Sequence, residues 1–279
     1  MGAIDDLRPG EQPMEEPPAP PAIDTSAAHQ ARVWNYFVGG KDNYPVDRAF
    51  AEEILRAYPG FDEVPRHARA FLGRAVRYLA EEAGVRQFLD IGTGLPTHDN
   101  THEVAQRVAP DSRIVYVDND PLVLTHARAL LTSTPEGACA YIDADARDPE
   151  GVLRAAAETL DFDRPVGLML LGVLGTVPDD GEARAILRTL LDALAPGSHL
   201  VLEDGTKTVR PDAAAEAERV RDESGYDYEL RTPDRIARFF DGLDLVEPGV
   251  VSVSRWRPES DAFGTPPQVD AFCGVARKP

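Results

Sequence analysis

The ten residues Phe88–Thr97, FLDIGTGLPT, decide how the rest of the chain is interpreted. A short apolar run ends on the acid Asp90, a glycine-rich bend follows at 92–94, and Thr97 opens a segment with helical spacing. This order is typical of a strand, a tight turn and the start of a helix. Glycines in such a turn let the backbone approach a ligand closely, and free N–H groups point into the crevice. We therefore predict a ligand-binding loop here.

From residue 86 onward, apolar runs alternate with amphipathic segments. The expected strands span residues 86–91, 113–118, 138–142, 165–171 and 198–203, and the expected helices span residues 97–108, 121–131, 149–159 and 181–194. Such alternation predicts right-handed crossovers and a mostly parallel sheet in an α/β fold with helices on both faces. Ligands of these sheets bind beyond the carboxyl ends of the strands. The informative residues therefore lie at the strand exits, which are Asp90, Asp118, Asp145, 171–175 and Glu203-Asp204.

The segments before and after this alternation have different patterns. Residues 1–22 are rich in proline and acids, and we expect a disordered tail there. Further helices are expected at 24–38 (capped by Thr25 or Ser26), 50–58, 64–83, 213–223 and 233–240. The strand-like segments 243–254 and 269–277 are expected to form a hairpin at an edge of the sheet.

The polar loop 39–48, GGKDNYPVDR, joins the first two expected helices. It carries acids and a cation between helices that pack through aromatic residues. Two interpretations stay open on the residues alone: a well-made interhelical turn, or a ligand-binding loop on a rigid scaffold.

Composition argues against several classes of function. The net charge is −19, from 48 acidic and 29 basic side chains, which argues against a broad contact surface for nucleic acid or an anionic membrane. The two cysteines, Cys139 and Cys273, are too few for a disulfide framework or a structural zinc site, and we expect buried thiols. No secretory signal pattern is visible, and the longest apolar run, Val166–Leu174, is too short to span a bilayer. We expect a cytoplasmic protein with no membrane partner.

Two nucleotide ligands compete for the glycine loop. Asp118 ends the second strand, where a carboxylate suits the two hydroxyl groups of a ribose. A dinucleotide such as NAD favours glycine or alanine three residues after the second glycine, but Thr97 stands there, and Asp90 would repel a pyrophosphate. The same acid would attract the α-ammonium group of S-adenosylmethionine. The acids at successive strand exits therefore favour S-adenosylmethionine.

Several motifs together resemble one family of enzymes. They are NYFVGGKDNYPVDR, FLDIGTGLPTHDNTHEVAQ, VYVDNDPLVLTHARALL, ADARDP, LLGVLGTVPD, RTPDRIARFF and GLDLVEPGVV. Over about residues 24–279 the chain is similar to class I S-adenosylmethionine-dependent methyltransferases, and more closely to an actinomycete family first catalogued as a domain of unknown function. The resemblance implies a Rossmann-like sheet of seven mostly parallel strands with the last one antiparallel. It also implies a helical N-terminal cap at 23–84 and a cofactor-binding domain at 85–279.

The resemblance further implies which residues surround the cofactor. They are Asp90, Gly92, Thr93, Gly94, Asp118, Asn119, Asp145, Ala146, Leu171 and Gly172. Asp118 would hold the ribose hydroxyls, and Asp145 would accept from the adenine amino group. A cap over the crevice favours the ligand-loop interpretation of 39–48, with contacts from Lys41, Asn43 and Tyr44. Arg69 would bind the cofactor carboxylate. Pro96 departs from the wider class, in which many members have a third glycine, and it removes a backbone donor.

Methyl transfer from a sulfonium is an in-line displacement in which positioning and desolvation supply much of the catalysis. An oxygen or nitrogen acceptor can also require a general base. The candidates for that base are His98, Asp99, His102, Glu203 and Asp204. The two histidines have the spacing of metal ligands on a helix, but the glutamate of the metalloprotease motif is missing, and no metal is expected.

The residues that follow the fourth expected strand, 172–175 (GVLG), argue against some classes of methyl acceptor. They include no NPPY-like tetrapeptide, which disfavours methylation of exocyclic amines of nucleic acids, and no Pro-Cys pair, which disfavours covalent attack on cytosine. With the acidic composition, this favours a small-molecule acceptor and no nucleic-acid partner. One alternative is a regulatory protein that binds S-adenosylmethionine without turning it over, with a sealed crevice. A weaker alternative is an NAD-dependent oxidoreductase.

Overall fold

The computed structural model describes residues 24–130, 132–225, 228–259 and 264–279. The tail expected to be disordered, residues 1–22, lies outside these ranges. Eight strands form one sheet in the described part of the chain, in the order β3-β2-β1-β4-β5-β8-β6, with β7 also paired to β8. Their bounds are β1 Gln87–Ile91, β2 Arg113–Asp118, β3 Ala138–Asp143, β4 Gly167–Leu171, β5 His199–Gly205, β6 Asp244–Leu245, β7 Val251–Ser252 and β8 Ala271–Arg277. The five strands expected from residue 86 onward are confirmed.

The direction of the strands creates a crevice at one edge of the sheet. Strands β1 to β5 are parallel, and β8 runs antiparallel to β5. The chain builds outward from β1 through β2 to β3 and then returns to place β4 on the other side of β1. Ligands of open α/β sheets bind at this reversal, beyond the carboxyl ends of the strands. The topology therefore brings the exits of β1, β2, β4 and β5 to one mouth.

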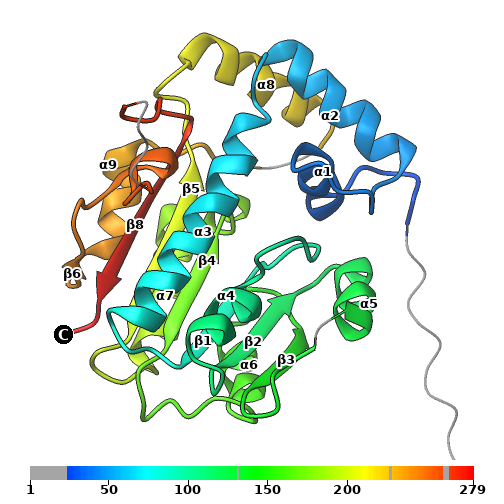
Figure 1. Ribbon diagram of the computed structural model, residues 1–279. Helices are drawn as coiled ribbons and strands as arrows, with labels where there is room; N and C mark the ends of the chain where they lie inside the picture. Colours follow the sequence, from blue (N-terminus) through cyan, green and yellow to red (C-terminus); the bar gives the residue numbers. More distant parts are fainter. Residues whose placement is uncertain (1–23, 131, 226–227, 260–263) are drawn as a thin grey trace, which may run out of the picture.

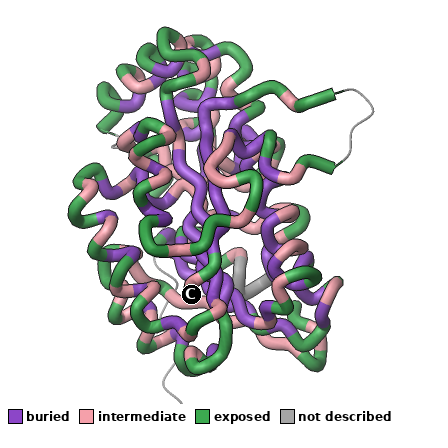
Figure 2. The backbone as a smooth tube through the Cα atoms, turned by 90° about the vertical axis from the view of Figure 1, so that its left-hand side faces the viewer, coloured by how far each residue is buried: buried purple, intermediate pink, exposed green. Residues whose placement is uncertain are grey.

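Helices cover both faces of the sheet (Figure 1). Their bounds are α3 Glu63–Glu81, α4 Thr101–Val108, α5 Pro121–Leu130, α6 Pro149–Ala156, α7 Asp180–Asp192 and α9 Pro233–Ala237. Successive side chains of a strand point to opposite faces. Phe88 accordingly packs with α3 and α4 in one core cluster, and Leu89 packs with α6 and α7 in the other. Figure 2 shows the buried backbone along the central strands and the exposed backbone on the outer turns.

A separate group of helices stands above the strand ends. It consists of α1 Gln30–Phe37, α2 Pro45–Ala57 and α8 Pro211–Glu223. Val33, Phe50 and Ile54 pack there against Ala214 and Ala217 of α8. We call α1, α2 and α8 the helical cap. The third expected N-terminal helix, α3, packs on the sheet face instead.

Some boundaries differ from the sequence-based expectation. Helix α1 begins at Gln30 rather than near residue 24, because neither Thr25 nor Ser26 caps it and His29 precedes its first turn. Helix α2 begins at Pro45, inside the segment 39–48 that was expected to be a loop, and the N–H group of Tyr44 donates to Asp47 Oδ2 at 2.8 Å. Proline is favoured at the first helical position, so this start is a good one.

Helix α4 and the late strands also differ. Helix α4 begins at Thr101 rather than at Thr97, with Asn100 as its N-cap residue and the Asn100 N–H group donating to Glu103 Oε2 at 2.8 Å. The late segment 243–254 is interrupted at residues 246–250 and forms two short strands, β6 and β7, which both pair with β8. The sheet therefore has eight strands rather than seven. No helix in the described ranges is both long and apolar enough to cross a bilayer.

Candidate functional site

A cavity of about 180 Å³ opens at the carboxyl ends of β1, β2, β4 and β5. Most residues that the sequence assigns to a ligand line it. They are Asp90, Gly92, Thr93, Gly94, Asp118, Asn119, Asp145, Ala146, Leu171 and Gly172, with Arg69 and Glu203. The cavity is therefore formed by residues far apart in the chain, which the parallel sheet brings to one edge.

The loop after β1 has a conformation that requires glycine. Gly92 and Gly94 have φ of 71° and 65°, in the left-handed region that disfavours other residues. A Cβ atom on Gly92 would lie 2.3 Å from Cγ2 of Val173. The N–H group of Gly94 donates to Asp118 Oδ2 at 2.8 Å, which joins the loop to the end of β2. The loop is therefore fixed between the ends of β1 and β2, beside the cavity.

Two buried carboxylates stand at this mouth. Asp90 Oδ2 accepts from the Thr101 hydroxyl at 2.6 Å, and burial raises the pKa of Asp90 to about 6, although Thr101 and Arg69 lower it. Burial also raises the pKa of Asp118, while the N–H groups of Asp120 and Gly94 oppose that shift. A cationic or hydroxyl-bearing ligand would relieve the cost of burying these carboxylates.

Helix α1 forms the side of the cavity that sequence reasoning missed. His29, Gln30, Ala31 and Trp34 all line the cavity. His29 Nδ1 lies 2.8 Å from Asp120 Oδ2, so the start of α1 is joined to the segment after β2. One residue could have indicated this from the sequence: Trp34 lies on the apolar face of the expected first helix.

The expected contacts from loop 39–48 are not found at the cavity. Lys41, Asn43 and Tyr44 are not among its lining residues. The Asn43 amide donates to Asn35 Oδ1 at 2.9 Å and to the carbonyl oxygen of Gly40 at 3.1 Å. These bonds close the loop on itself and on α1, as in the interhelical turn.

The two histidines that were candidate bases also lie off the cavity lining. His98 precedes α4, so it does not share a helix face with His102, and Arg69 donates to the His98 carbonyl at 3.2 Å. His102 is buried, and its Nδ1 lies 2.8 Å from the Tyr116 hydroxyl. Asp99 pairs with Arg107 at 2.7 Å. Among the described residues, no three His, Cys, Asp or Glu side chains are grouped to hold a metal ion.

A second cavity, of about 80 Å³, lies between the helical cap and the end of β5. It shares Gln30, Trp34, Glu203 and Tyr228 with the first cavity. Its other walls include apolar side chains of α1, α2 and α8, together with residues of α3, the end of β5 and the segment before α9. Glu203 and Tyr228 therefore stand where a polar crevice meets an apolar pocket.

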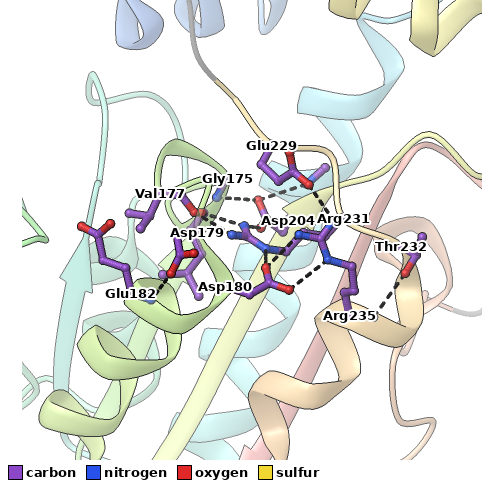
Figure 3. Close-up of polar contacts among 12 residues, drawn as sticks. Gly175, Val177, Asp179, Asp180, Glu182, Asp204, Glu229, Arg231, Thr232 and Arg235 are labelled. Carbon is purple, nitrogen blue, oxygen red and sulfur yellow. Dashed lines mark hydrogen bonds and ion pairs between the residues drawn. The ribbon is translucent and has the colours of Figure 1, made fainter.

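The acids Glu203 and Asp204, adjacent at the end of β5, have different surroundings. Asp204 accepts from Arg231 at 3.0 Å and from the Gly175 N–H group at 3.1 Å (Figure 3). It also accepts from the Tyr228 hydroxyl at 2.6 Å. Burial raises the pKa of Asp204 to about 6, but the Tyr228 and Arg231 donors lower it, and the carboxylate is charged at neutral pH.

Glu203 has no such partners. Glu203 is 3% exposed, and no hydrogen bond to its carboxyl group is found among the described residues. Burial and the neighbouring charge of Asp204 raise the pKa of Glu203 to about 8. A group in this state can exchange a proton near neutral pH.

Comparison with known proteins adds the family. Residues 16–279 match the model of a family described as S-adenosyl methyltransferase. A DUF574-family protein from Streptomyces avermitilis has a TM-score of 0.88 and 44% identity, over 92% of this chain and 100% of that one. A candidate methyltransferase from Thermobifida fusca has a TM-score of 0.84 and 42% identity, over 93% and 98% of the two chains.

More distant proteins share the fold. An S-adenosylmethionine-dependent methyltransferase from Anabaena variabilis has a TM-score of 0.52 at 14% identity, over 93% of this chain and 99% of that one. No curated protein matches the sequence.

Proposed function

The chain belongs to the S-adenosyl methyltransferase family, and from that premise we propose that it transfers a methyl group from S-adenosylmethionine to a small-molecule acceptor. The observation that carries the proposal is the meeting of two cavities at Glu203 and Tyr228. One cavity has the carboxylates and glycine loop that suit the cofactor. The other offers an apolar pocket for an acceptor.

The residues of the first cavity fit the groups of the cofactor. Asp118 suits the ribose hydroxyls, with Asn119 beside it, and the Asp145-Ala146 segment suits the adenine. Asp90 is a buried carboxylate that suits the α-ammonium group, and Arg69 suits the carboxylate. When bound, the cofactor supplies an electrophilic methyl group on a sulfonium. The chain binds and orients it, and α1 covers the crevice and excludes water.

The alternative of a sensing protein that does not turn the cofactor over predicts a sealed crevice. The second cavity adjoins the first and offers room beside it, which favours an enzyme. The net charge of −19 supports a small acceptor rather than a nucleic acid. We also propose a cytoplasmic location, since both Cys139 and Cys273 are free thiols. Tight binding of duplex DNA or transfer RNA at physiological salt would contradict the small-acceptor proposal.

Asp118→Ala is expected to weaken binding of S-adenosylmethionine and S-adenosylhomocysteine by roughly 10- to 100-fold, because hydrogen bonds to a charged group contribute about 1.5–3 kcal/mol. Calorimetric titration of the purified protein measures both affinities, with NAD as a third ligand. Asp143→Ala is the matched control, since Asp143 is exposed and pairs with Asp118 in the sheet register. Binding of NAD alone, or of none of the three ligands, would overturn the proposed function.

A further inference from the structure

We propose that the acceptor is an amine on a short apolar stem, that the stem enters the cavity between the helical cap and the end of β5, and that Glu203 binds the ammonium group and takes its proton. This proposal rests on the proposed function and names the substrate class for the same site.

The size and the lining of the second cavity indicate how large and how apolar the stem of the acceptor is. Val33, Phe37, Phe50, Ile54 and Ala217 line it, so most of its surface is apolar. Its volume of about 80 Å³ is roughly half of the ~150 Å³ that accommodates benzene in an engineered protein cavity. A branched group of roughly three or four carbon atoms fits this space.

Glu203 lies at the opening of this cavity toward the cofactor crevice. Glu203 lines both cavities, and a Cβ atom built on Gly172 would lie 3.7 Å from Glu203 Oε2. Gly172 itself lines the cofactor crevice. The carboxyl group is therefore on the path between the apolar pocket and the expected position of the methyl donor.

The charges around Glu203 favour a cation. Asp204 is already paired with Arg231 and with the Tyr228 hydroxyl. Asp270, in the wall of the apolar cavity, accepts from the Tyr58 hydroxyl at 2.9 Å and from two backbone N–H groups. The carboxyl group of Glu203 has no donor among the described residues, and a buried carboxylate without one is costly.

One further cation lines the apolar cavity. The Arg221 guanidinium lies 6.0 Å from the ring centroid of Tyr228. An ammonium group on the ligand would bring both the missing charge and up to three donors to Glu203. An alcohol of the same skeleton brings one donor and no charge.

The same contact supplies the base. The ammonium gives a proton to the Glu203 carboxylate, and the freed nitrogen lone pair then forms the new bond to the methyl carbon. The electron pair of the broken carbon–sulfur bond stays on sulfur, which leaves S-adenosylhomocysteine and the methylated amine. Glu203 afterwards releases its proton to water. In the empty site Glu203 holds a proton, because burial and the charge of Asp204 raise its pKa to about 8. The ammonium group of the ligand stabilises the carboxylate, so that proton is released to water when the amine binds, and the carboxylate then acts as the base.

The test compares isobutylamine with isobutanol, which share a carbon skeleton, by calorimetric titration into the full-length protein saturated with S-adenosylhomocysteine. We expect the amine to bind at least tenfold more tightly than the alcohol. Glu203→Gln is expected to lower amine affinity to the level of the alcohol and to leave S-adenosylhomocysteine affinity within about twofold. Glu150→Gln, in the exposed first turn of α6, is the matched charge control.

The pocket is tested separately on α8. Ala217→Leu fills the cavity and is expected to abolish amine binding, whereas Ala215→Leu, on the exposed side of the same helix, is expected to preserve it. Melting temperatures show whether each variant is folded. Equal affinity for amine and alcohol, no amine binding, or unchanged amine affinity in Glu203→Gln would overturn the proposal. In each case S-adenosylhomocysteine binding by the parent protein shows whether the proposed function still stands.

Discussion

Arg231→Met is expected to lower the free energy of unfolding by about 3–5 kcal/mol, because removing one partner of a buried ion pair leaves the other charge uncompensated. Arg231 is fully buried, and its guanidinium donates to Asp180, to Asp204 and to the carbonyl oxygen of Val177 (Figure 3). It also donates to the carbonyl oxygen of Leu174. Methionine keeps much of the volume and none of these donors. Urea unfolding followed by circular dichroism gives the difference.

Arg235→Met is the matched control for this prediction. Arg235 also pairs with Asp180, and with Glu229, but its side chain is 31% exposed. Water can replace the lost contacts there, so the expected loss is under about 1 kcal/mol. Equal losses in the two variants would show that burial of the guanidinium does not determine the stability of this cluster.

The cluster around Arg231 also shapes the site. It joins the end of β5, the 3₁₀ turn Leu174–Thr176, the start of α7 and the segment before α9. Because Arg231 pairs with Asp204, the Asp204 carboxylate stays charged. Its charge lies beside Glu203 and disfavours the charged form of Glu203. Of these two adjacent residues, Asp204 therefore has a structural role, and Glu203 is available to a ligand.

The sheet could be predicted from the sequence because its central strands β1, β2, β4 and β5 are buried on both faces. Strand β4 is the continuous apolar run GLMLL, and the expected strand bounds there hold to within two residues. The starts of the helices were harder to predict from the sequence. No standard capping side chain marks the start of α1, and the start of α4 at Thr101 depends on bonds made by Asn100 rather than on the apolar pattern.

The candidate site was predictable where topology alone sets it. Parallel strands bring their carboxyl ends to one edge, so Asp90, Asp118 and Asp145 could be expected to meet. Contacts of the helical cap could not be predicted in this way. The Asn35–Asn43 bond that closes loop 39–48, and the packing of α8 over α1 and α2, depend on side chains that no spacing rule brings together.

Glu203→Gln is expected to make the protein more stable than its parent at alkaline pH, by an amount that grows as pH rises. The folded protein holds the Glu203 proton up to a pKa of about 8, whereas the ordinary value is 4.5. Stability from the protonated form is therefore complete below pH 4.5 and is lost as pH rises toward 8. Glutamine has no proton to lose, so the variant escapes this loss.

The measurement is urea unfolding of parent and variant at several values from about pH 5.5 to 8.5, at fixed ionic strength. The difference in unfolding free energy should increase by on the order of 3 kcal/mol across this range and level off above it. Asp90 and Asp118 also titrate with raised pKa values, but they are common to both proteins and cancel in the difference. The exposed variant Glu150→Gln should follow the parent. Parallel profiles for parent and Glu203→Gln would mean that Glu203 finds a partner in the folded protein, and the case for an ammonium ligand would lose its basis.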